Sequence, residues 1–500
     1  MRQVISRVLL AGLLLAGGAC SVLGGSDEDP ARGVRRVTIA SGLRYAGSDD
    51  VDEQLVPEPL VAQAFTIYVP DGHEGFVVRT AAPGPGGTVV VDDVPAGAYY
   101  LRRRDASAVD FYLVSDADSV DLSVRAPGRP PSFATQPTPV MVAGTGMSPW
   151  SAGCFVELYS PGAGAYVYAL QDLAAHGRPS EGDVDLGLVL DWQALAAPLP
   201  GASASDACSV MQLVPAPGPE QVTLSRLTRS YSSACSLADG QAGTIDGLFV
   251  DAPARSLDID WQRASFFAAL ADSDAGRPLF PWSTFLSVGT LPHADRVGTY
   301  GGAFPDLLMM YAGPDVVVDS EVRGSFDYGD PFPVEWPRFV WVWAVAKVSV
   351  ELDGLGLPVV LDAASLSVYP LDGEPIAARL SVARAIELDG APLTAPLRAT
   401  SRTPTLSWQP PRLGSATDYR IDVVRLEPNG AGDYAWTPLA ELSTRATSVQ
   451  LPPDLLVSGG HYLVRLIAVA RAGVDVTRTP GWDSLPFQVA GTWTSTFSAP

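Results

Sequence analysis

Reactive side chains are scarce in this chain of 500 residues. Lys347 is its only lysine, and it contains just four histidines and four cysteines. No Gly-x-Ser-x-Gly segment marks a strained nucleophile turn, and no Cys-x-x-Cys or Cys/His cluster has the spacing of a zinc site. The sequence therefore indicates no catalytic residue, no metal site and no cofactor. We expect a non-enzymatic protein.

A run of apolar residues long enough to span a membrane is missing from the amino terminus. Arg2 and Arg7 precede the apolar segment 8–15, and the small residues 16–19 follow it. This order of charged, apolar and small residues is that of an export signal over residues 1–19. Its apolar core is far shorter than the roughly 20 residues that cross a bilayer.

Cys20 directly follows the small residues. The segment resembles the lipobox of bacterial lipoproteins, in which this cysteine receives a diacylglycerol, although Gly17 stands where that family usually has an aliphatic residue. The resemblance implies a lipid anchor at Cys20. Ser21, in place of an aspartate, implies the outer membrane, facing either the periplasm or the medium. The alternative is an ordinary secretory signal that leaves Cys20 as a plain thiol. Residues 20–36 would form a flexible tether.

Acidic side chains outnumber basic ones. Without Arg2 and Arg7 the chain has 31 basic and 55 acidic residues, a net charge of −24. This sign disfavours nucleic acid as a partner. The expected partners are the membrane, through lipidated Cys20, and a glycan or a protein.

The cysteines after Cys20 are odd in number, which leaves room for one disulfide and one thiol. Cys208 and Cys235 lie in loop-like sequence rich in serine and alanine, whereas Cys154 precedes apolar residues. We prefer the pair Cys208–Cys235, with Cys154 as a buried thiol. All three pairings remain open from the sequence alone.

Short alternating apolar runs, rich in valine and separated by turn residues, dominate the chain. They predict a mostly β protein, a multi-domain array of antiparallel β-sandwiches of the Ig-like or fibronectin type III-like kind, with a few short helices in the middle. In the first domain, residues 37–125, segment 88–101 reads as a strand, a turn at Gly97 and a second strand. It resembles the closing segment of prealbumin-like or Cna-B-like sandwiches of bacterial surface proteins.

A proline-rich linker, residues 126–139, leads to a β-rich middle region, residues 140–393, that resembles no known family. Helices are predicted at 167–176 and 262–273, each ahead of a glycine. Segment 339–352 alternates strictly, with aliphatic residues on one face. Its other face carries Trp341 and Trp343, with Trp336 nearby, as a possible binding platform for a sugar or peptide. Packing against a neighbouring domain or loop is the preferred interpretation of these three side chains.

Acidic groups in the middle region offer an alternative function, that of a surface hydrolase of the glycosidase type. Such enzymes use two carboxyl groups. The candidate sets are Asp258 with Asp260, and Asp327 with Asp330 and Glu335. Solvated turns are the preferred interpretation, because a strongly acidic chain must place carboxylates widely.

The last domain, residues 396–490, has the clearest fold signal. Trp408 lies in a segment similar to the second strand of fibronectin type III modules, and Leu456 precedes Tyr462 by six residues, as in the tyrosine corner of that family. The resemblance implies that Trp408, Leu456 and Tyr462 are core residues and that the Tyr462 hydroxyl binds upstream backbone. Residues 491–500 are expected to be a tail.

Overall fold

The computed structural model of this protein describes residues 33–46, 54–72, 75–104, 109–127, 131–132, 138–151, 153–162, 165–167, 183–190, 199–200, 206–219, 222–235, 240–272, 278–292, 304–314, 321–351, 358–371, 373–428 and 434–500. The predicted signal, Cys20 and most of the tether lie outside these residues. The regular secondary structure of the described part is mostly β-strands that form packed sheets, which confirms the predicted fold class. Within it, no helix is long and apolar enough to cross a membrane.

The first module is a sandwich of sheet β10-β1-β7-β6 and strands β5-β4-β8-β9. Alternate residues of β1 and β7, among them Val37, Ile39 and Val91, are buried between the layers. The predicted turn forms between β7 and β8, where Gly97 has a φ of +112°. The strands and 3-10 turns are β1 (Val34–Ala40), β2 (Gly42–Ala46), β3 (Gln54–Pro57), η1 (Ala62–Ala64), β4 (Phe65–Pro70), β5 (Phe76–Thr80), β6 (Ala82–Pro83), η2 (Pro85–Gly87), β7 (Val89–Pro95), β8 (Tyr99–Arg104), β9 (Asp110–Ser115), β10 (Ser119–Asp121) and β11 (Val124–Pro127).

The predicted linker, residues 126–139, covers the end of β11, all of β12 and the start of β13. Beyond it, β13 pairs with β16 and β20, β12 with β17, and β22 with β25, beside strands of a much larger sheet. The strands of the middle region are β12 (Pro131–Ser132), β13 (Thr138–Thr145), β14 (Phe155–Ser160), β15 (Ala165–Val167), β16 (Asp183–Leu190), β17 (Leu199–Pro200), β18 (Asp206–Ala216), β19 (Thr223–Cys235), β20 (Gly243–Leu248), β21 (Val250–Asp251), β22 (Ala254–Trp261), β23 (Leu279–Thr290), β24 (Asp306–Ala312), β25 (Val322–Gly329), β26 (Arg338–Glu351) and β27 (Pro358–Pro370).

Helix α3 (Arg263–Ala271) forms where a helix is predicted over 262–273. Its alanine-rich sequence favours a helix. Phe266 packs into the core of the middle region, whereas Leu270 packs into that of the last module. The helix therefore joins two cores. The other predicted helix, 167–176, lies outside the described residues apart from Val167, which ends β15.

The last module is built of two sheets, with sheet β29-β28-β31-β34 facing strands β33-β32-β35-β36. Trp408, Leu456 and Tyr462 are buried in its core. The strands are β28 (Arg384–Leu388), β29 (Ala391–Pro392), β30 (Leu397–Arg398), β31 (Thr405–Gln409), β32 (Asp418–Pro428), β33 (Tyr434–Thr444), β34 (Ser448–Gln450), β35 (His461–Arg471), β36 (Phe487–Trp493) and β37 (Phe497–Ser498). The module thus begins before residue 396, and the expected tail contains paired strands.

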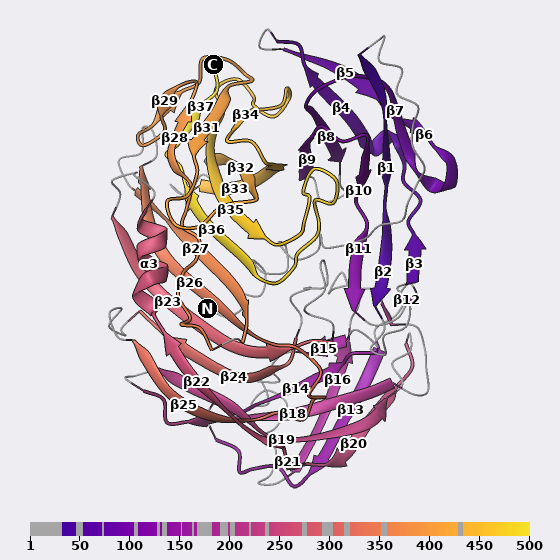
Figure 1. Ribbon diagram of the computed structural model, residues 1–500, viewed down its shortest axis with the longest axis vertical. Helices are drawn as coiled ribbons and strands as arrows, with labels where there is room; N and C mark the ends of the chain where they lie inside the picture. Colours follow the sequence, from indigo (N-terminus) through magenta and orange to yellow (C-terminus); the bar gives the residue numbers. More distant parts are fainter. Residues whose placement is uncertain are drawn as a thin grey trace.

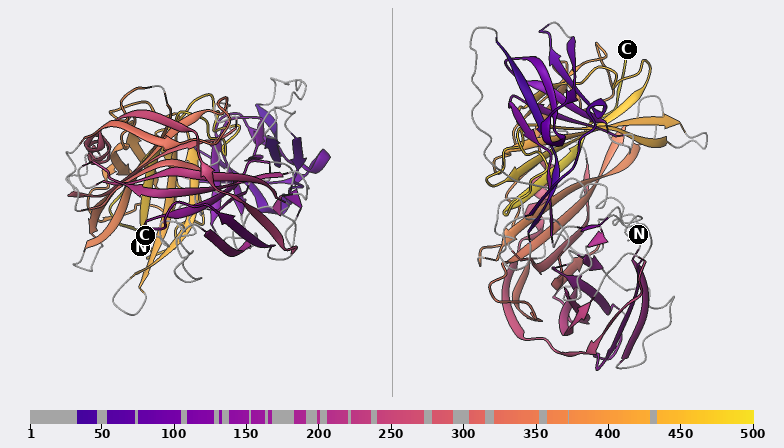
Figure 2. Two further views of the ribbon diagram at one scale, coloured as in Figure 1. Left: turned by 90° about the horizontal axis from the view of Figure 1, so that it is seen from below. Right: turned by 90° about the vertical axis from the view of Figure 1, so that its right-hand side faces the viewer.

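Among the described residues, one sheet of 19 strands passes through all three regions. Its pairings can be followed from β14 and β18 through β19, β24, β23, β26 and β27 to β36, β35, β32 and β33. There β33 pairs in parallel with β9, and the sheet continues through β8 and β4 to β5. The terminal modules consequently lie side by side, with β13, β16 and β20 at the opposite end of the molecule (Figures 1 and 2).

The joint between the terminal modules is packed as well as hydrogen-bonded. Tyr68, Tyr100 and Tyr112 of the first module belong to the same core cluster as Trp408. In the opposite direction, Val476 of the last module is buried among the core residues of the first. Strands β4, β8 and β9 therefore contribute to a core on each of their faces.

Candidate functional site

Strand β26 presents the two tryptophans that the sequence singles out. Val340, Val342 and Ala344 are buried on one face of the strand, as the alternation predicts. Trp341 and Trp343 lie on the other face and are half-buried, with ring centroids 6.4 Å apart. They are thus neighbours on one surface.

Trp336 does not join this pair. It lies in the turn before β26, where it stacks on Phe332 at 5.3 Å and meets Tyr159 edge to face at 6.4 Å. Both of those rings are buried in the middle core. Trp336 is half-buried and packs against the middle core, as Trp341 also does. Because Trp336 stacks on Phe332, the platform reduces to Trp341 and Trp343.

Neighbouring strands extend the surface. Trp343 stands opposite Phe285 of β23, which stands opposite Tyr311 of β24. On the other side Trp343 faces Leu366 of β27, and Leu366 faces Val489 of β36. Directly paired residues project from the same face of a sheet. We call the row Tyr311, Phe285, Trp343, Leu366 and Val489, together with Trp341, the aromatic face.

Charged groups lie further along the strands, beyond the buried Val345 on β26. The Lys347 ammonium lies 4.9 Å from the centroid of the Trp282 ring and forms an ion pair with Asp362. The Trp493 indole donates a hydrogen bond of 3.1 Å to the Asp362 carbonyl. An apolar surface with polar groups at its edge is the composition of a binding patch. The sequence does not reveal this row, because its members lie on strands far apart in the chain.

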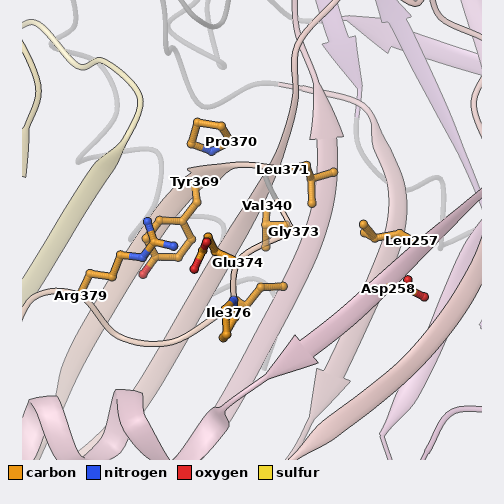
Figure 3. A pocket seen from close by; sticks show the side chains of 11 residues that line it. Leu257, Asp258, Val340, Tyr369, Pro370, Leu371, Gly373, Glu374, Ile376 and Arg379 are labelled. Carbon is orange, nitrogen blue, oxygen red and sulfur yellow. The ribbon is translucent and has the colours of Figure 1, made fainter.

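The carboxylates considered for a glycosidase are largely engaged by arginine. Asp260 lies 3.0 Å from the Arg323 side chain, and the buried Asp330 accepts hydrogen bonds of 2.8 and 2.9 Å from Arg338. Asp258 lines a hollow between β22 and residues 369–379 (Figure 3). The hollow holds only about 20 Å³, room for little more than a water molecule.

A different pair of carboxyl groups is buried in the middle core. Glu157 of β14 is 0% exposed and Asp306 of β24 is 6% exposed. The Asp306 amide donates to Glu157 at 3.0 Å, the Tyr166 hydroxyl donates to Glu157 at 3.1 Å, and Ser287 donates to Asp306. The pair ties two strands that are not neighbours in the sheet.

Burial decides the protonation of this pair. It raises the pKa of Glu157 well above the ordinary value of 4.5, and the neighbouring Asp306 charge raises that pKa further. Burial also raises the pKa of Asp306, from 3.8 to about 6. Two carboxyl groups in contact cannot both ionise without strong repulsion. The pair therefore retains a proton under mildly acidic conditions.

The cysteines are partly assigned. Cys208 on β18 is disulfide-bonded, and Cys154 is a free, buried thiol. Cys235 ends β19 opposite Asp206, two residues before Cys208, and its side chain lies outside the described part. The disulfide partner of Cys208 is therefore Cys235 or Cys20, and the pair Cys208–Cys235 stays a prediction.

Comparisons with known proteins give little. No family model matches this chain, and neither does any curated protein. Among solved structures, that of a streptococcal ancillary pilin is 13% identical over 66% of this chain and 95% of that chain, with a TM-score of 0.13. A score this low leaves the likeness without weight for fold or function.

Proposed function

We propose that this chain is a non-enzymatic, lipid-anchored protein of a bacterial cell envelope. It acts as a β-sandwich arm that presents the aromatic face to a glycan or a protein partner. The observation that carries the proposal is the sheet of 19 strands, because it joins the terminal modules and the middle region through direct strand pairing. Such pairing suits a stiff spacer better than flexibly linked domains.

The anchor is proposed to be Cys20 at the outer membrane, with the tether ahead of β1 separating the arm from the lipid. A lipoprotein cysteine carries more than one acyl chain, which holds a soluble domain stably at a membrane. The test is fractionation of the producing bacterium with mass analysis of the amino terminus. The natural chain should sediment with outer membranes and carry the added mass of the lipid. The Cys20→Ser variant should instead be found in the soluble fraction. A soluble, unmodified natural chain would refute the anchor.

The binding role is proposed for the aromatic face. Large rings with adjoining charges are the side chains that dominate binding energy at interfaces. Glycan and peptide arrays probed with the whole protein should identify ligands. Trp343→Ala should weaken that binding by about tenfold or more. The control is Val334→Ala, at a side chain that is 74% exposed and lies outside the row. Equal loss in both variants would refute the assignment.

The surface hydrolase remains a second proposal because of Glu157 and Asp306, a carboxyl pair that keeps a proton. Enzymes of this kind need one carboxyl group as acid and another as base or nucleophile. Both side chains are enclosed by the middle core, which favours a structural role. Turnover of soluble oligosaccharides by the natural protein, lost in a folded Glu157→Gln variant, would reverse that preference.

A further inference from the structure

Strand β5 is the last strand of the long sheet, at the end away from the middle region. Among the described strands it pairs with β4 alone. Figure 1 shows it at the outer side of the first module. On one face of the strand, Phe76 packs against Tyr68 and Tyr100 of the joint with the last module. Val77 is 39% exposed and Val78 is 50% exposed. Natural edge strands are usually protected by charge or proline, and the sequence of β5 contains one charge and no proline.

The backbone of β5 has a defined open side. The Asp71 amide donates to the Gly75 carbonyl at 3.0 Å, so these two residues form a hydrogen-bonded pair where β4 turns into β5. Such pairs alternate with non-bonded pairs along antiparallel strands. Val77 and Arg79 therefore direct their amides and carbonyls toward β4. Phe76, Val78 and Thr80 direct theirs away from β4, toward the open edge of the sheet.

We propose that β5 is an interaction surface that pairs in antiparallel fashion with β5 of a second copy of this chain. The sequence of the strand fits itself when Val78 lies on the twofold axis. Val78 then faces Val78 of the other copy as a hydrogen-bonded pair, Phe76 faces Thr80, and Val77 faces Arg79. This register joins apolar residues at the centre and keeps the two arginines apart, so no like charges stand opposite each other.

The contact is expected to be weak for a dissolved protein. A strand of five residues buries a small area, and Arg79 already makes a long hydrogen bond of 3.3 Å to the Val78 carbonyl that pairing must replace. Chains held on one surface meet at a much higher effective concentration. This last point rests on the proposed anchor, whereas the pairing itself does not.

The first experiment is sedimentation velocity of the processed chain with Cys20→Ser, over a range of concentrations. A reversible monomer–dimer equilibrium is expected. Val78→Pro removes an amide that points outward and should abolish the dimer while the monomer stays folded. Val77→Pro removes an amide that points to β4 and should instead destabilise the first module. A monomer at every concentration, or a dimer that survives in folded Val78→Pro, overturns the proposal.

The second experiment tests the register. Under oxidising conditions Val78→Cys should give a disulfide-linked dimer, because residues paired across the axis have Cα atoms about 5.5 Å apart, within disulfide range. Val77→Cys should not, because the register places its counterpart opposite Arg79. Equal trapping of both variants, or trapping of neither, overturns this register. Neither experiment needs lipid. Both therefore test the pairing of β5 even if the proposed anchor is wrong.

Discussion

At the scale of single residues, the buried carboxyl pair makes stability depend on pH. The native protein keeps a proton on Glu157 and Asp306 that the unfolded chain releases near pH 4. The unfolded state then binds fewer protons, so this pair lowers the free energy of unfolding as the pH rises from about 4 to about 6. The pair is thus most favourable to folding in acid, opposite to a carboxylate held by an ion pair.

Glu157→Gln tests this dependence, because the amide keeps the size of the side chain and cannot ionise. Relative to the natural protein, the variant should gain unfolding free energy as the pH rises above about 4.5, by about 1–3 kcal/mol in all. Denaturant titrations at several pH values measure the difference. Glu335→Gln, at an exposed carboxylate, is the control. A difference between natural protein and variant that does not change with pH would contradict the assignment.

The tyrosine corner depends on a glycine. The Val457 amide donates to the Tyr462 hydroxyl at 2.6 Å. A Cβ atom on Gly460 would lie 2.5 Å from that hydroxyl oxygen, closer than real contacts allow. Gly460→Ala should therefore displace Tyr462 and lower the free energy of unfolding by about 1–3 kcal/mol. Thermal unfolding measures the loss. Gly459→Ala is the comparison: that site has open space around it and a φ of +72°, so its cost is backbone strain, whereas the cost at Gly460 is the clash.

At the scale of elements, the disulfide of Cys208 in β18 can be used to test both the predicted cysteine pair and the proposed lipid anchor. Because Cys154 is free, non-reducing peptide mapping should link Cys208 to Cys235. A link from Cys208 to Cys20 would contradict the predicted pair. It would also exclude lipid on Cys20, because one sulfur atom cannot form both bonds. One measurement therefore bears on two predictions.

Local elements were largely predictable from the sequence. The alternation in β26, the helix α3 and the turn at Gly97 each depend on residues close together in the chain. Pairings between distant segments were not. Glu157 and Asp306 are 149 positions apart, and no local pattern indicates that they meet. The aromatic face was missed for the same reason. The alternation in β26 indicates Trp343, but only the pairing of β23, β24 and β26 places Phe285 and Tyr311 beside it.

At the scale of the whole molecule, the shared cores predict coupling between modules distant in sequence. Val476 is 1% exposed and packs into the core of the first module. Val476→Ala should remove about 1–3 kcal/mol of stability. Hydrogen exchange should show the loss in β1 and β7, which belong to the other module. The exposed Val457→Ala is the control. Loss of protection confined to the last module would contradict the coupling.

The parallel pairing of β9 with β33 has a consequence for how the chain is made. The Ser115 hydroxyl at the end of β9 binds the Thr477 carbonyl, 362 positions later. The ribosome completes the first module long before it synthesises β33. Until then the edge of β9 that pairs with β33 stays unpaired, and the face of the first module that packs against the last module stays exposed. Such an edge is prone to pair with other chains. We therefore expect the nascent chain to need a chaperone or rapid completion to keep that edge free for its own carboxyl-terminal module.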